Sequence, residues 1–162
     1  MNMKNLRYNR EAAVAYGRRW ALGRNPAYFT FDGLGGDCTN FISQCIYAGT
    51  GVMNYTPQVG WFYRSASDRT ASWTGVEFLY EFLVGNGSVG PYGYEVRLDA
   101  LRTGDVIQLG SSEGEFYHSL MVVELKPRIL VVAHSDDALN RPLSSYSFGQ
   151  LRGIHIAGVR AW

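Results

Sequence analysis

A glycine-rich segment delivers a cysteine to the start of a predicted helix. Residues 33–41 read GLGGDCTNF, with Cys38 in what should be the first helical turn. Backbone amides at a helix start lack intrahelical partners, and with the helix dipole they stabilise a thiolate. Cys38 is therefore the candidate nucleophile. Asp37 directly before it is a candidate N-cap, with a second role in placing the turn that carries Cys38.

A predicted hairpin far along the chain brings a candidate base into position. Residues 116–124 and 129–134 are apolar and β-branched, which predicts two strands joined by a short turn at residues 126–128. Opposed residues in an antiparallel pair lie about 5 Å apart at Cβ. Centring the hairpin on its turn places His118 opposite residues 134 to 136.

These residues can form the working parts of a cysteine hydrolase. Such an enzyme needs a thiolate, a base that later protonates the leaving amine, and a third group that orients the base. Cys38, His118 and His134 would fill those roles, with the oxyanion bound at the Cys38 amide. A one-residue slip exchanges the two faces of a strand, so the orienting residue stays open between His134 and the following carboxylates, Asp136 and Asp137.

Other readings of the same residues are weaker. The glycine-rich run lacks the Gly-Lys-Ser/Thr of a phosphate loop, and Asp37 would repel an anion. Cys38, His118 and His134 are of types that bind zinc, but no CxxC or HExxH spacing supports a metal site. We expect no metal and no cofactor.

Four further residues have structural readings. Cys45 should be buried packing, and it lies about 10 Å from Cys38 along the helix axis, too far for a disulfide. His155 alternates with isoleucines in a predicted strand and reads as a surface or satisfied histidine. Trp61 and Trp73 either line a substrate cleft or belong to the core, and the sequence favours neither.

Helices are predicted in the first half of the chain and strands in the second, which indicates an α+β fold with helices packed on an antiparallel sheet. The expected helices span residues 10–22 (N-cap Asn9), 38–48 (stop at Gly49) and 74–85 (capping box of Thr74 and Glu77). The expected strands span residues 106–109, 116–124, 129–134 and 153–162.

Composition limits the class of protein. The 162 residues are 46% hydrophobic and 18% charged with a net charge of +1, which fits a single folded domain over residues 1–162. The sequence shows no basic patch, so we expect no nucleic-acid partner. The N-terminal segment has no uninterrupted apolar stretch, so we expect neither a secretory signal nor a membrane span in this chain. We expect a monomer.

The chain also resembles known families. Similarity to the NlpC-type cell-wall peptidases, a branch of the papain-like cysteine peptidases, lies in DCTNFISQC, Thr103-Gly104-Asp105, Tyr117-His118-Ser119 and Val132-Ala133-His134. Similarity to the bacterial domain family labelled putative amidase spans nearly the whole chain. It lies in YNREAAVAYGRRWA, GGDCTNFISQC, Gly60-Trp61, Ser72-Trp73 and AHSDD followed by Arg141-Pro142-Leu143.

The resemblance implies a papain-like fold and hydrolysis of an amide or peptide bond, with peptidoglycan peptides as the usual substrate and the cell envelope or exterior as the place of action. The order Cys, His and a polar third residue maps onto Cys38, His118 and His134. Because Asp136 and Asp137 follow so closely, a carboxylate could replace His134 as the orienting residue. Two alternatives remain: acyl transfer by the same triad, and a cell-wall binding module without turnover.

Overall fold

The structure is a computed structural model that describes residues 2–162. Its helices are α1 (Arg10–Trp20), α2 (Cys38–Thr50), α3 (Ala71–Thr74) and α4 (Val76–Gly85), with 3-10 turns at Leu98–Ala100 and Leu143–Ser145. Its strands are β1 (Lys4–Leu6), β2 (Tyr63–Ser65), β3 (Asp68–Arg69), β4 (Gly90–Val96), β5 (Val106–Gly110), β6 (Phe116–Glu124), β7 (Leu130–Ala133), β8 (Ala138–Pro142) and β9 (Gln150–Ala161). No helix within residues 2–162 has the length and apolar character that crossing a bilayer requires.

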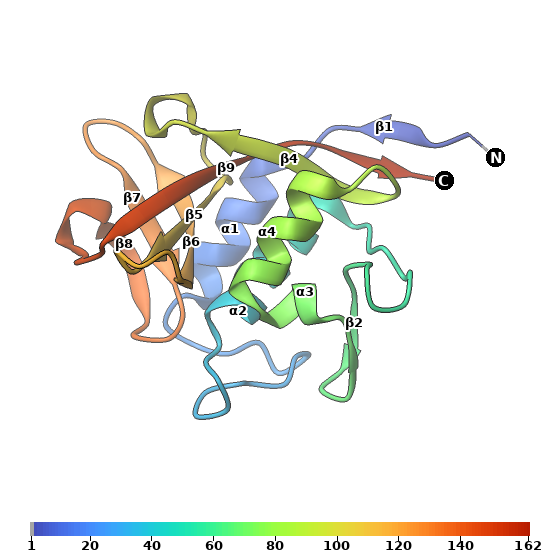
Figure 1. The fold of residues 1–162 in the computed structure, drawn as a ribbon, viewed down its shortest axis with the longest axis horizontal. Coiled ribbons are helices and arrows are strands. Elements are labelled where there is room, and N and C mark those ends of the chain that lie inside the picture. The colour runs from blue at the N-terminus through green and yellow to red at the C-terminus, as the bar shows by residue number, and fades with distance from the viewer. Residues whose placement is uncertain (1) are drawn as a thin grey trace.

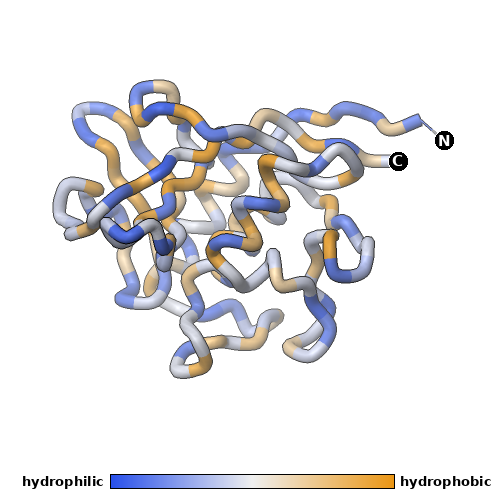
Figure 2. The backbone as a smooth tube through the Cα atoms, viewed as in Figure 1, coloured by the Kyte–Doolittle hydropathy of each residue, from blue (hydrophilic) through white to orange (hydrophobic). Residues whose placement is uncertain are grey.

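One antiparallel sheet organises the molecule, so the α+β prediction is confirmed. Within residues 2–162 it has seven strands in the order β1-β9-β5-β6-β7-β8, with β4 also paired to β9. Helices α1, α2 and α4 pack against the sheet (Figure 1). Strands β1 and β9 pair, so the two ends of the chain lie side by side (Figure 2).

Both faces of the central strands are buried. Val106 and Met121 belong to the core between helices and sheet, whereas their neighbours Ile107 and Val122 belong to a second apolar cluster on the opposite face. Successive side chains of a strand point to opposite faces, so two buried faces require the nearly continuous apolar runs seen in the sequence. The sheet is therefore a rigid central layer to which site residues can be attached.

Helix α2 begins at Cys38 as predicted but does not end at Gly49. Gly49 lies inside the helix because the chain before α1 passes against it: a Cβ there would lie 2.5 Å from the Tyr8 ring. The amide of Asn9 also donates to the Gly49 carbonyl at 2.8 Å. The helix ends instead at Gly51, whose φ of 64° is the left-handed conformation that glycine favours.

The capping box predicted at Thr74 and Glu77 is wrong. Gly75 separates α3 from α4, and neither helix has a side-chain cap at its start. The Thr74 hydroxyl instead accepts from Arg69 at 3.2 Å, and Glu77 forms an ion pair with Arg152 of β9 at 2.9 Å. These tertiary partners replace the local pairing that the sequence pattern favoured.

The predicted hairpin forms, but its ladder is shorter than expected. Met121 pairs with Val132, and the β6–β7 pairing does not continue towards His118. Continuing that register would place His118 opposite Ser135, within the expected window. His118 is paired instead with Leu109 of β5 on the other side. The chain after β7 is therefore free to turn away from β6.

A buried carboxylate ties the start of α1 to the sheet. Asp105, fully buried in the Thr-Gly-Asp turn before β5, accepts from Arg10 at 2.7 Å, His155 at 2.8 Å and the backbone amides of Arg102 and Ile156. His155 is therefore a satisfied structural histidine, as one of the two readings proposed.

We expect Asp105→Asn to lower the free energy of unfolding by about 3 kcal/mol, because it leaves the Arg10 guanidinium without its buried counter-charge. Urea denaturation followed by circular dichroism would measure the loss. Asp99→Asn is the matched control, since Asp99 is 74% exposed and its pair with Arg97 lies on the surface. Equal losses in the two variants would contradict the role of Asp105.

Candidate active site

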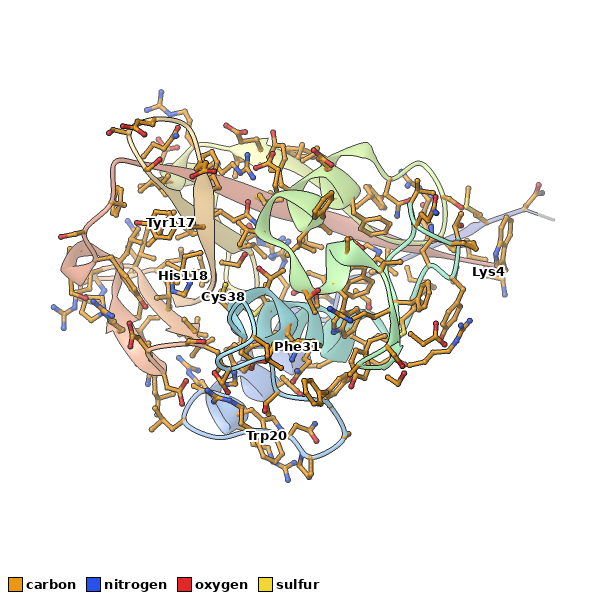
Figure 3. All side chains as sticks on the ribbon, turned by 60° about the horizontal axis from the view of Figure 1, so that its bottom comes forward. Lys4, Trp20, Phe31, Cys38, Tyr117 and His118 are labelled. Atoms are coloured by element: carbon orange, nitrogen blue, oxygen red, sulfur yellow. The ribbon has the colours of Figure 1, made fainter. Side chains whose placement is uncertain are left out.

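The candidate nucleophile and base line one pocket. A cavity of about 470 Å³ is bounded by Cys38 at the start of α2 and by His118 on β6. Figure 3 shows these two side chains beside each other, reached from different elements. Asp136, Arg141 and Tyr146 line the same cavity from the chain that follows β7. The structure thus brings Cys38 and His118 together with one of the expected carboxylates.

Glycines shape the approach to Cys38. Gly33, Gly35 and Gly36 all have positive φ, at 76°, 93° and 101°, which a residue with a side chain rarely adopts. Gly35 and Gly36 line the pocket, and a Cβ at either would contact nothing within 4 Å. The wall beside Cys38 therefore has no side chains at Gly35 and Gly36, and Cys38 itself is partly exposed.

His118 is held as a neutral imidazole at physiological pH. Burial lowers its pKa to about 4, Asp136 opposes that shift, and the positive Arg141 adds to it. A neutral imidazole has a free ring nitrogen that can take the proton of a thiol. His118 is therefore in the protonation state that a general base requires.

Asp136 reaches the pocket through an unusual backbone conformation. Its φ of 52° lies in the left-handed region, which aspartate tolerates better than most residues. Its charge acts on His118, although no direct hydrogen bond joins the two side chains among residues 2–162.

His134 lies apart from this pair and makes other bonds. Its Nδ1 contacts Asp37 Oδ2 at 2.7 Å, and its Nε2 lies 2.8 Å from the Trp20 carbonyl oxygen. Its ring stacks on Phe41, with the centroids 3.9 Å apart. Both ring nitrogens are thus engaged, and no contact with His118 is present within residues 2–162. These contacts join His134 to Asp37, Trp20 and Phe41, and the orienting role expected for it stays a prediction.

Asp37 occupies the N-cap position of α2 without capping it through its side chain. Its carboxylate instead accepts from the Phe31 amide at 2.8 Å, the Asn40 side chain at 2.9 Å and His134. It therefore joins the glycine-rich loop, the first turn of α2 and the end of β7. The expected second role, placing the turn that carries Cys38, matches these contacts better than capping does.

Asp137 forms an ion pair with Arg24 outside the pocket. Arg24 contacts Asp137 at 2.9 Å and Asp32 at 2.8 Å, and it also approaches Asp37 at 3.7 Å. The Arg24 guanidinium lowers the pKa of Asp32, so this group stays charged. Asp137 thus fastens the loop before α2 to the turn after β7.

The two tryptophans belong to the core. Trp61 and Trp73 are both 0% exposed, their rings lie 4.6 Å apart, and their indole nitrogens donate to Ser43 and Asn40. Neither has surface left for a substrate, so the cleft reading is set aside. Cys45 is likewise fully buried, as expected, and both cysteines are free.

A buried polar chain behind Cys38 was not foreseen. The hydroxyls of Thr39 and Ser119 lie 3.0 Å apart, Gln108 donates to Ser119 at 3.2 Å, and Arg152 donates to Gln108 at 2.7 Å. Gln108 and Ser119 interrupt the apolar runs of their strands, which is the sequence signal for these two residues. Because a buried polar group needs its partner, the chain fixes α2 against β5, β6 and β9.

Arg141 and Tyr146 are pocket residues that sequence reasoning did not assign. Arg141 appeared only as part of a family motif, and Tyr146 follows it in an irregular segment. No periodicity or spacing connects them to Cys38. Within residues 2–162, no three or more histidine, cysteine or carboxylate side chains are grouped so as to hold a metal ion.

We expect iodoacetamide to label Cys38 in the folded protein and to leave Cys45 unmodified, because burial of Cys45 also raises the pKa of its thiol. Peptide mass spectrometry would locate the label, with denatured protein as the control in which both cysteines react. His118→Ala should slow labelling of Cys38 about tenfold, since the base is lost. Unchanged labelling in that variant would contradict activation of the thiol by His118.

Comparisons with known proteins agree with the resemblance to the amidase domain. The description "putative amidase domain" matches residues 7–157 of the chain. The uncharacterized protein YhbB of Bacillus subtilis (strain 168) is 36% identical over 122 residues, which are 73% of this chain and 38% of that relative. No solved structure gives a significant match. The matched domain indicates amide hydrolysis in general, and the chain belongs to the putative amidase domain family.

Proposed function

We propose that the protein hydrolyses amide bonds through Cys38, in a papain-like arrangement, with peptidoglycan peptides as the substrate class. The observation that carries this proposal is the convergence of Cys38, His118 and Asp136 on one pocket in a chain of the amidase family. The thiol lies where unpaired helix-start amides favour a negative charge, and the imidazole beside it is unprotonated. The resemblance to the NlpC-type peptidases supplies the substrate class.

The reaction has two steps. Cys38 Sγ attacks the amide carbonyl carbon while His118 takes the thiol proton, and the oxyanion is stabilised by the Cys38 backbone amide. His118 then gives its proton to the leaving amine as the C–N bond breaks, which leaves a thioester. A water molecule, deprotonated by His118, attacks the thioester, and the thiolate leaves and recovers the proton.

Asp136 is the orienting residue in this proposal. Its negative charge stabilises the imidazolium that forms when His118 accepts a proton, and it lines the pocket with the histidine. His134 is bound to Asp37 and the Trp20 carbonyl, which supports a role in holding the Cys38 loop. In this proposal Asp136 orients His118, while His134 helps Asp37 to hold the loop that carries Cys38.

Incubation with purified peptidoglycan should release fragments that carry one added water, and Cys38→Ala should release none. Mass spectrometry would identify the products. Cys45→Ala is the matched control and should retain release, since Cys45 lies in the core. Products joined to an added amine would replace hydrolysis by acyl transfer. Binding without any product from the wild-type protein would replace it by a binding module.

The pH profile separates the two candidates for the orienting residue. The acid limb of kcat/KM should lie near pH 4, where His118 gains a proton and ceases to be a base. Asp136→Asn removes a charge that raises the pKa of His118, so the limb should move to lower pH. In that variant kcat/KM at pH 7 should also fall about 10- to 100-fold.

His134→Gln should leave the acid limb near pH 4 and lower the free energy of unfolding, because Asp37 loses a buried partner. Asp137→Asn is the matched carboxylate control and should also leave the limb in place, since Asp137 pairs with Arg24. A limb that moves in His134→Gln and stays in Asp136→Asn would return the orienting role to His134.

A further inference from the structure

A tyrosine that lines the pocket carries a covered hydroxyl group that forms no hydrogen bond within the described residues. The Tyr146 hydroxyl oxygen is buried, and within residues 2–162 it is the sole buried side-chain polar atom without a hydrogen-bond partner. Leaving such a group unpaired costs about 1–3 kcal/mol. Burial raises the pKa of Tyr146, so the hydroxyl keeps its proton and is a donor at neutral pH. Because the hydroxyl oxygen is covered, a ligand group can accept from it only after a small movement of the Tyr146 side chain.

An arginine with spare donors lies next to this hydroxyl. Arg141 donates from Nε to Ser145 Oγ at 2.8 Å and from Nη2 to the Ser145 carbonyl oxygen at 3.2 Å. A guanidinium has five N–H donors, so three remain free. Within residues 2–162 no carboxylate lies within 4 Å of it, and it shares this with the half-buried Arg69 and Arg160, but Arg141 is the one that lines the pocket with Cys38 and His118.

The two residues are held as one unit. The Arg141 guanidinium carbon lies 3.7 Å from the centre of the Tyr146 ring, a stacked contact that fixes the plane of the guanidinium. The bonds to Ser145 hold it from the other edge. Such a held guanidinium loses little rotamer freedom when it binds a carboxylate through two parallel hydrogen bonds.

We propose that Arg141, joined by the Tyr146 hydroxyl once a small movement of that side chain uncovers it, binds a carboxylate group of the substrate, so that the preferred substrates are amides with a free carboxylate close to the bond that is cleaved. That the bound carboxylate belongs to a substrate rests on the proposed function, whereas the binding of a carboxylate does not. Asp136 also lines the pocket and would repel a carboxylate. Its presence beside His118 therefore confines the anionic end of the substrate to Arg141 and sets the direction in which the amide lies.

The test measures binding without turnover, in Cys38→Ala. Three ligands of matched size are titrated: N-acetyl-glutamate α-amide carries only a side-chain carboxylate, N-acetyl-glutamine only a main-chain carboxylate, and N-acetyl-glutamine amide neither. The Nε–Hε resonance of Arg141 in NMR spectra reports binding. At least one carboxylate should bind about tenfold tighter than the neutral amide, and the tighter of the two identifies which kind of carboxylate is read.

Arg141→Gln in the Cys38→Ala background should abolish this preference, as measured from backbone amide shifts around the pocket. Arg128→Gln removes the same charge from an exposed turn at the far end of the β6–β7 hairpin, and it should keep the preference. Equal affinity for charged and neutral ligands, or a preference that survives Arg141→Gln, would overturn the proposal. If the wild-type protein releases nothing from peptidoglycan while the Cys38→Ala protein still prefers the charged ligands, the proposed hydrolysis is wrong and the carboxylate site is retained.

Tyr146→Phe tests the hydroxyl separately. Because the hydroxyl has no partner in the protein, its removal should leave the unfolding midpoint unchanged or raise it, while the carboxylate affinity falls about 3- to 10-fold. A lower midpoint with unchanged affinity would show that the hydroxyl is structural and would overturn its part in the site.

Discussion

The position of Cys38 depends on the buried carboxylate of the preceding residue. Asp37 is 1% exposed and accepts hydrogen bonds from the Phe31 amide, Asn40 and His134, which belong to three separate parts of the chain. A buried charge is stable only while such partners remain, so the loop, the helix start and the end of β7 must be formed together. The location of Cys38, the candidate nucleophile, thus depends on tertiary contacts, although the helix itself is local.

The other residues of the site lie in two contrasting environments, one apolar and one hydrogen-bonded. His118 lies on a strand of a sheet buried on both faces, and that burial keeps it neutral. Behind Cys38 the polar chain from Thr39 to Arg152 prevents α2 from sliding on the sheet. Burial in the apolar layer therefore keeps the candidate base His118 neutral, while the hydrogen-bonded layer holds the helix that carries Cys38 against the sheet.

Sequence patterns predicted what depends on neighbours along the chain: the α+β class, the start of α2 at Cys38, the β6–β7 hairpin and the burial of Cys45. They failed where distant contacts decide. Gly49 lies inside the helix as the place where Tyr8 packs closely against it, and Glu77 pairs with Arg152 in place of the expected capping contact. That Asp136 rather than His134 lines the pocket with His118 could not be predicted, because it depends on how the chain turns after the β6–β7 ladder has ended.

Strand β8 lies at the edge of the sheet and leads directly into the segment that carries Tyr146. Edge strands have one neighbour and tolerate substitution, insertion and rearrangement better than central strands. Arg141 sits on this edge, whereas Cys38 and His118 belong to elements packed on both sides. Relatives could thus change the proposed ligand contacts by remodelling β8 and the segment after it, while the elements that carry Cys38 and His118 stay the same. Selectivity would then diverge faster than the chemistry of the site.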